Sequence, residues 1–184
     1  MRTFLAIDIR PDDNFKKILL DIKQSLTDTT INWVDFSVLH ITLAFLGNVR
    51  ENTISKIQAD IVKKSGCFVN FQIQIGNIGI FGTIDNPKVI WVGVKQSEQL
   101  FQLHKIINNI VSQHCFIDKT HSFKPHITIG RIKQLTDINV VNNAVQKYGD
   151  RIFQNIQCNK ITMYHSILKP KGPIYKPLFE QRFR

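Results

Sequence analysis

Apolar and polar positions recur along this chain with two different periods, which predict strands and helices in turn. Short apolar or alternating runs predict strands at 4–9, 39–47, 68–81, 89–94, 125–131 and 153–168. Apolar residues at helical spacing predict helices from Asp12–Asp13 to Leu26, over 51–64, over 98–113 and over 138–149. The pattern therefore indicates an α+β protein.

The same order of elements occurs twice. A strand, a helix, a His-x-Thr strand, a second helix and closing strands follow one another, and 86 residues separate both His40 from His126 and Phe4 from Ile90. A fixed period indicates two copies of one unit, here 1–84 and 87–168, followed by a C-terminal strand segment at 169–184. We expect a single bilobal domain over 1–184, with two pseudo-symmetric lobes, each an antiparallel sheet covered by helices, and an active-site cleft between them.

Two of the predicted strands carry nearly the same residues. One has the sequence L-H-I-T-L-A-F-L-G from Leu39, and the other has P-H-I-T-I-G-R from Pro125. Because side chains alternate between the faces of a strand, His40 and Thr42 share one face, and His126 and Thr128 repeat the arrangement. Each lobe would present one imidazole and one hydroxyl to the cleft.

Two facing imidazoles suit chemistry at a phosphodiester, which needs a base for the nucleophile and an acid for the leaving oxygen. Histidine titrates near neutral pH, so one ring can be neutral while the other is protonated. The hydroxyls of Thr42 and Thr128 can donate to non-bridging oxygens, and Arg131 can add a guanidinium. Strict alternation places Arg131 on the opposite face, unless a bulge at Gly130 turns it back. Spacing alone does not say which histidine is the acid.

Charge and cysteine content narrow the partners and the compartment. The chain has 24 Lys and Arg against 14 Asp and Glu, a formal charge of +10 that favours polyanions such as nucleic acid. The motifs hold no carboxylate, and no H-E-x-x-H or D-x-D pattern occurs, so we expect neither a metal nor another cofactor. Three widely spaced cysteines argue against a disulfide framework, and no apolar run is long enough to span a membrane. We expect a cytoplasmic protein.

On these residues the chain resembles the two-histidine phosphoesterases, and within them the RNA 2′,3′-cyclic phosphodiesterases, once called 2′-5′ RNA ligases. The similarity extends beyond H-I-T-L-A-F-L-G and P-H-I-T-I-G-R to Arg2–Ile7, Trp33–Val34 and the stretch from Ser166 to Tyr175. The resemblance implies metal-independent hydrolysis of a terminal 2′,3′-cyclic phosphate to a 2′-phosphomonoester. It also implies that His40 protonates the leaving 3′ oxygen and His126 accepts the proton of water, with 2′-5′ ligation as an accompanying activity. The expected partner is RNA with a cyclic phosphate end, such as a tRNA fragment, bound by a monomer.

Two other functions remain open on the sequence. One is a non-catalytic RNA-binding or nucleotide-binding module, and the other is the same chemistry on a small cyclic nucleotide. His104 and His114 lie in or at the end of the helix over 98–113, where structural roles are sufficient. Trp33 and Tyr164 could stack a base, although core packing explains them equally well.

Overall fold

Helices and strands follow one another largely as predicted in the computed structural model, which describes residues 1–27, 29–83, 85–95, 97–116, 122–135, 137–149, 151–169 and 172–184. The first repeat holds β1 (Arg2–Asp8), α1 (Asp13–Ser25), β2 (Thr30–Trp33), β3 (His40–Asn48), α2 (Glu51–Lys63) and β4 (Phe71–Thr83). The rest of the chain holds β5 (Asn86–Val94), α3 (Glu98–Ser112), β6 (His126–Gln134), α4 (Ile138–Tyr148), β7 (Ile152–Cys158), β8 (Lys160–Ile167) and β9 (Ile174–Arg182). The predicted closing stretch over 153–168 is thus two strands, which meet at Asn159.

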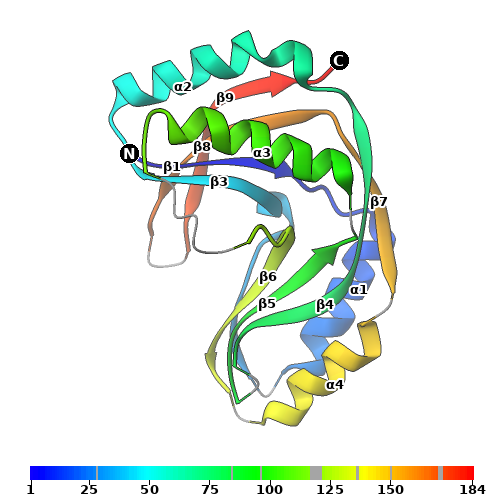
Figure 1. The fold of residues 1–184 in the computed structure, drawn as a ribbon. Helices are drawn as coiled ribbons and strands as arrows, with labels where there is room; N and C mark the ends of the chain where they lie inside the picture. The colour runs from blue at the N-terminus through cyan, green and yellow to red at the C-terminus, as the bar shows by residue number, and fades with distance from the viewer. Residues whose placement is uncertain are drawn as a thin grey trace.

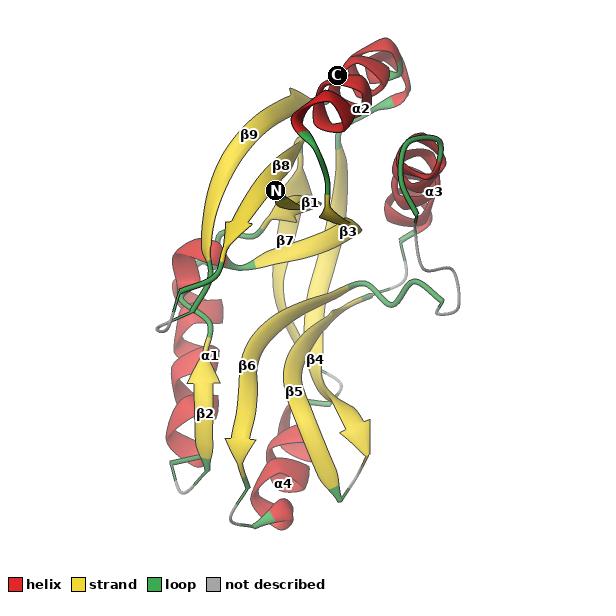
Figure 2. Cartoon of the chain, turned by 90° about the vertical axis from the view of Figure 1, so that its left-hand side faces the viewer, coloured by secondary structure: helices red, strands yellow, loops and turns green. Residues whose placement is uncertain are grey.

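The strands form one antiparallel sheet that is pinched in the middle. Its order is β7-β4-β5-β6-β3-β1-β8-β9, with β2 paired to β6. At the pinch, β3 and β6 share a single register pair, Ile41 with Ile127. On either side the sheet opens into two lobes, one with β3, β1, β8 and β9 and the other with β6, β5, β4 and β7 (Figures 1 and 2). The predicted bilobal α+β fold is confirmed.

The two repeats do not each build one lobe, which corrects the expectation from the sequence. Helix α1 of the first repeat packs over the second lobe: Phe15 contacts Phe153 of β7 at 5.7 Å between ring centroids, and Asn14 Nδ2 donates to the Phe153 carbonyl at 2.8 Å. Conversely, α3 of the second repeat packs on β3 (Figure 2). The division of the sequence into repeats at 1–84 and 87–168 itself stays a prediction.

A short connection explains part of this exchange. Strand β4 ends the first repeat, yet Thr83 and Asn86 pair where β4 meets β5, so the two strands form a hairpin. A tight hairpin forces its strands to lie side by side. Strand β4 therefore has to join the second lobe, where it is also paired with β7. Strand β8 makes the reciprocal crossing and pairs with β1 in the first lobe.

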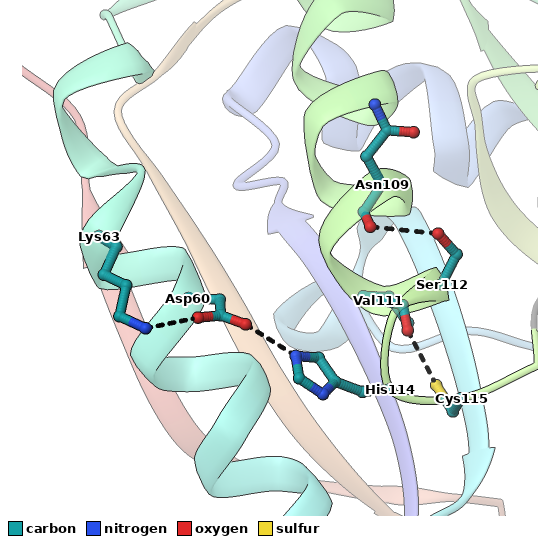
Figure 3. Close-up of polar contacts among 7 residues, drawn as sticks. All are labelled: Asp60, Lys63, Asn109, Val111, Ser112, His114 and Cys115. Carbon is teal, nitrogen blue, oxygen red and sulfur yellow. Dashed lines mark hydrogen bonds and ion pairs between the residues drawn. The ribbon is translucent and has the colours of Figure 1, made fainter.

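A polar contact joins the two helices that cover the first lobe. Asp60 of α2 accepts hydrogen bonds from Lys63 at 3.0 Å and from Nε2 of His114, just after α3, at 2.7 Å (Figure 3). The bond from His114 is the main reason that the pKa of Asp60 lies below its ordinary value. His114 therefore has a structural role, as the sequence indicated.

The cysteines and the helices of the chain have the properties that the sequence analysis considered. The cysteines Cys67, Cys115 and Cys158 are all free thiols. Among the described residues, no helix combines the length and the apolar character needed to cross a membrane.

Candidate active site

His40 and His126 begin the two strands that meet at the pinch of the sheet. From His40 and from His126 onward, β3 and β6 have the same succession of half-buried, buried and exposed positions. Ile41 and Ile127 are paired and fully buried. Because the strands are antiparallel, the residues that flank this pair lie beside each other on the opposite face, His40 near Thr128 and Thr42 near His126. The structure therefore brings the four predicted side chains together.

Both imidazoles are held by the backbone in the same way. Nδ1 of His40 lies 2.8 Å from the Val38 carbonyl oxygen, and Nδ1 of His126 lies 2.7 Å from the Lys124 carbonyl oxygen. A carbonyl can only accept a hydrogen bond, so Nδ1 carries the proton in both rings. In the neutral ring Nε2 then bears the lone pair, and in the charged ring it bears the acidic proton. Each histidine thus keeps one nitrogen for proton transfer.

A bulge in each motif strand moves the fifth residue after the histidine onto the cleft face. Thr128 pairs with Trp91 and Gly130 with Ile90, which leaves Ile129 without a partner on β5. Its carbonyl instead accepts a hydrogen bond from the backbone N–H of Val34 at 2.9 Å. The residue that follows the bulge, Arg131, is exposed. The bulge thus lies at Ile129, directly before Gly130, and it returns Arg131 to the face of Thr128, which is the condition that the sequence analysis set for this residue.

The charge of Arg131 acts on the site. Burial lowers the pKa of both His40 and His126, and the charge of Arg131 lowers each further. Burial raises the pKa of the Tyr175 hydroxyl on β9, and Arg131 opposes that rise. The register agrees, because Thr128 and Arg131 pair with Trp91 and Val89, which are two residues apart on β5 and so share one face of the sheet.

The corresponding position of β3 holds an aromatic residue. Thr42 pairs with Ala6 and Ala44 with Leu5, so a bulge at Leu43 repeats the one in β6. It turns Phe45 outward, with 67% of its surface exposed. Phe4 lies between Phe45 and His40, with ring centroids 6.2 and 5.0 Å from theirs, so all three share the cleft face.

Aromatic rings pack edge-on against each histidine. Tyr175 meets the His40 ring at 5.3 Å, and Phe81 of β4 meets the His126 ring at 4.7 Å. Trp91 lies 6.4 Å from His126 and covers Gly79, where an added Cβ would come within 2.2 Å of the indole. Such packing holds the two imidazoles in fixed orientations, as a site for proton transfer requires.

Burial and charge together set the protonation of the two histidines. Loss of solvent is the largest influence on both, and it lowers their pKa below the ordinary value of 6.5. Asp8, the cross-strand neighbour of His40, raises the pKa of that ring and so favours its charged form. Among the described residues no carboxylate raises the pKa of His126, where Arg131 instead favours the neutral form. Arg131 lowers the pKa of His40 as well, so the carboxylate of Asp8 is the charge that distinguishes the surroundings of the two rings.

Asp8 is a site residue that the sequence reasoning missed. Its carboxylate accepts hydrogen bonds from Tyr164 Oη at 2.6 Å and Thr162 Oγ1 at 3.1 Å, and Lys160 Nζ lies 3.5 Å away. The signal was available, because Phe4, Ala6 and Asp8 alternate onto one face of the first strand. The hydrogen bond also ties the Tyr164 hydroxyl to Asp8.

Packing contacts within the protein account for the remaining candidates, Trp33 and His104. The Trp33 indole packs beside Gly130, with Lys23 Nζ 5.6 Å from its ring centroid. His104 is stacked on Phe123 at 3.7 Å between centroids. Within the described ranges, no three His, Cys, Asp or Glu side chains gather as metal ligands would, and the absence of a metal stays a prediction.

Proteins of known sequence resemble this chain over nearly its whole length. The RNA 2′,3′-cyclic phosphodiesterase of Thermotoga maritima is 34% identical over 187 residues, which cover 100% of this chain and 96% of that protein. The protein of the same name from Archaeoglobus fulgidus is 32% identical over 179 residues, covering 97% of this chain and 98% of its own.

Solved structures agree on the fold. TT0787 of Thermus thermophilus superposes with a TM-score of 0.81 at 22% identity, covering 100% of this chain and 98% of its own. LigT of Escherichia coli, complexed with ATP, superposes with a TM-score of 0.69 at 20% identity, covering 99% and 97%. The family model described as the 2′-5′ RNA ligase superfamily matches residues 11–166, which include both histidine motifs. With this match, the duplicated motifs and the relatives above, the chain belongs to the 2′-5′ RNA ligase superfamily.

Proposed function

We propose that this protein is an RNA 2′,3′-cyclic phosphodiesterase that hydrolyses the terminal cyclic phosphate to a 2′-phosphomonoester. The observation that carries the proposal is the pair of His40 and His126, anchored alike through Nδ1 on two strands that pair at the residues next to them, Ile41 and Ile127. Relatives that carry this name match nearly the whole chain, which supports the same activity here.

In the proposed reaction, Nε2 of His126 takes a proton from water as the water oxygen attacks phosphorus. The bond from phosphorus to the 3′ oxygen breaks, and Nε2 of His40 gives that oxygen a proton. The phosphate stays on the 2′ oxygen. Asp8 supports this assignment, because its charge favours the protonated form of His40, and among the described residues no carboxylate acts on His126 in the same way.

The other cleft residues bind the substrate. The hydroxyls of Thr42 and Thr128 donate to non-bridging phosphate oxygens, and Arg131 supplies a charge-assisted contact to the same group. Phe45 offers its exposed ring to the terminal base, because base stacking on an aromatic side chain needs no particular sequence.

The same geometry supports ligation. If the 5′-hydroxyl of a second RNA replaces water as the nucleophile, the bond from phosphorus to the 3′ oxygen breaks and a 2′-5′ linkage forms. We further propose that the protein acts as a monomer in the cytoplasm, with tRNA fragments among its substrates. The free thiols of Cys67, Cys115 and Cys158 support a reducing compartment.

A single assay tests the proposal. The protein is incubated in EDTA with an oligonucleotide that ends in a 2′,3′-cyclic phosphate, and the product is analysed for the hydroxyl that keeps the phosphate. We expect a 2′-phosphate in EDTA, and loss of the product in both His40→Ala and His126→Ala. A 3′-phosphate, a requirement for added metal, or full activity in both variants would refute it. Salt-dependent RNA binding with no turnover would instead favour a binding module.

A further inference from the structure

A basic pocket lies at the end of β1, where Asp8 is part of its lining. It has a volume of about 340 Å³ and is formed by the end of β1, the junction of β7 with β8, and β9. The charged side chains of its lining are Asp8, Arg10, Lys160 and Arg182. Ligand pockets in proteins begin at about this size.

The cations of this basic pocket exceed its carboxylates. Arg10, Lys160 and Arg182 line it together with a single carboxylate, Asp8. Lys160 is shared between Asp8 at 3.5 Å and Glu180, which lies outside the lining, at 2.6 Å. Both arginines are exposed, and a guanidinium is the side chain best suited to the oxygens of a phosphate. The pocket therefore favours an anionic ligand that also makes polar contacts with its walls.

The basic pocket adjoins the candidate active site. Asp8 is the register partner of His40, and directly paired residues of antiparallel strands have Cα atoms about 4.5–5.5 Å apart. Phe45 lies on the other side of His40, beyond Thr42 along β3. If the terminal base rests on Phe45, the RNA chain on the 5′ side of the terminal ribose leaves His40 toward Asp8 and the pocket.

We infer that the basic pocket binds the internal phosphodiester next to the terminal nucleotide, so that the enzyme selects RNA strands over mononucleotides. This inference rests on the proposed function, since it concerns the substrate of that same site. Arg10 and Arg182 contact the phosphate, and the junction of β7 with β8 forms the wall beside the sugar. A nucleoside 2′,3′-cyclic phosphate has no internal phosphodiester and leaves the pocket empty.

The test compares two substrates and two single-charge variants. The substrates are adenosine 2′,3′-cyclic phosphate and a pentanucleotide that ends in a 2′,3′-cyclic phosphate. Wild type should prefer the pentanucleotide, and Arg182→Gln and Arg10→Gln should each raise its KM about ten-fold while leaving the mononucleotide unchanged. Each variant should also make the slope of log KM against log salt shallower, by the amount that corresponds to one lost phosphate contact. Arg50→Gln, at the start of α2, removes the same charge elsewhere and should change neither substrate.

The outcomes separate the pocket from the proposed function. Equal losses on both substrates, or no loss on the pentanucleotide, would overturn the inference and leave the activity intact. If wild type hydrolyses neither substrate, the proposed function fails, and the pocket is then judged by binding. Fluorescence anisotropy with a labelled pentanucleotide ending in a 3′-phosphate should give about ten-fold weaker binding for Arg182→Gln than for Arg50→Gln. Equal binding by these two variants would contradict the pocket.

Discussion

The two histidine strands, β3 and β6, have the same backbone geometry but differently charged neighbours. On both walls a histidine bonds through Nδ1 to the carbonyl two residues earlier, and a bulge turns the fifth following residue outward. That fifth residue is Phe45 on one wall and Arg131 on the other. The charge of Asp8 acts to raise the pKa of His40 but not that of His126, whereas Arg131 acts to lower the pKa of both. The predicted duplication accounts for the like anchoring of the two imidazoles, and the different neighbouring side chains support the separate roles proposed for them.

The first way to break this comparison is to remove each ring. His40→Ala and His126→Ala should each lower kcat by about 10²- to 10⁴-fold, because each removes one proton transfer. Turnover of the cyclic oligonucleotide measures the effect, and thermal unfolding checks that the fold survives. His165→Ala is the control, since its neighbour Tyr164 faces the cleft and alternation directs His165 to the other face of β8. A loss confined to one of the two motif variants would contradict paired catalysis.

The second prediction concerns Arg131, which occupies the fifth position after His126, as Phe45 does after His40. Arg131→Gln should reduce kcat/KM by about 10- to 100-fold through a lost contact to phosphate, and Arg131→Lys should recover part of it. Because Arg131 lowers the pKa of both histidines, the pH profile of Arg131→Gln should also move to higher pH. Lys56→Gln, on exposed α2, should change neither quantity. An unchanged profile would place Arg131 outside the site.

The third concerns Phe45, the aromatic member of that pair. Phe45→Ala should raise KM by about ten-fold for an oligonucleotide, because stacking of one base is worth roughly 1–3 kcal/mol. Phe45→Trp should keep the wild-type KM. With ribose 2′,3′-cyclic phosphate, which has no base, Phe45→Ala and wild type should be equal. A ten-fold loss on this substrate too would show that Phe45 does not act through the base.

The fourth prediction, with the smallest expected effect, concerns Asp8. Removing its charge in Asp8→Asn lowers the pKa of His40, so the charged form needed for the acid is lost at lower pH. The alkaline limb of kcat/KM against pH should therefore move to lower pH. Tyr164→Phe removes a hydrogen bond to Asp8 but keeps the charge, and should shift the limb less. A shift of the limb to higher pH would contradict the assignment of His40.

Sequence periodicity predicted much of this arrangement. The spacing of His40, Thr42, His126 and Thr128 placed one imidazole and one hydroxyl on each motif strand, and the repeat predicted that the strands would meet. The bulge next to Gly130 was anticipated from the glycine. These features are local, because alternation along one strand determines them.

The rest depends on contacts between distant segments. The apolar stripe of α1 shows which face is buried, but not that it covers β7 of the other lobe. The basic pocket brings Arg10, Lys160 and Arg182 together from three parts of the chain, and no spacing in the sequence reports that. The sequence also did not show what Trp33 and Tyr164 contact. Lys23 lies over the Trp33 ring, and the Tyr164 hydroxyl donates a hydrogen bond to Asp8.

The difference between the two walls is tested most directly with a leaving group that needs no acid. A cyclic substrate with sulfur in place of the 3′ oxygen has a less basic leaving atom, so protonation by the enzyme matters less. With this substrate the loss caused by His40→Ala should shrink by about ten-fold or more, while the loss caused by His126→Ala should persist. Equal losses for both variants, or recovery of His126→Ala alone, would contradict the account.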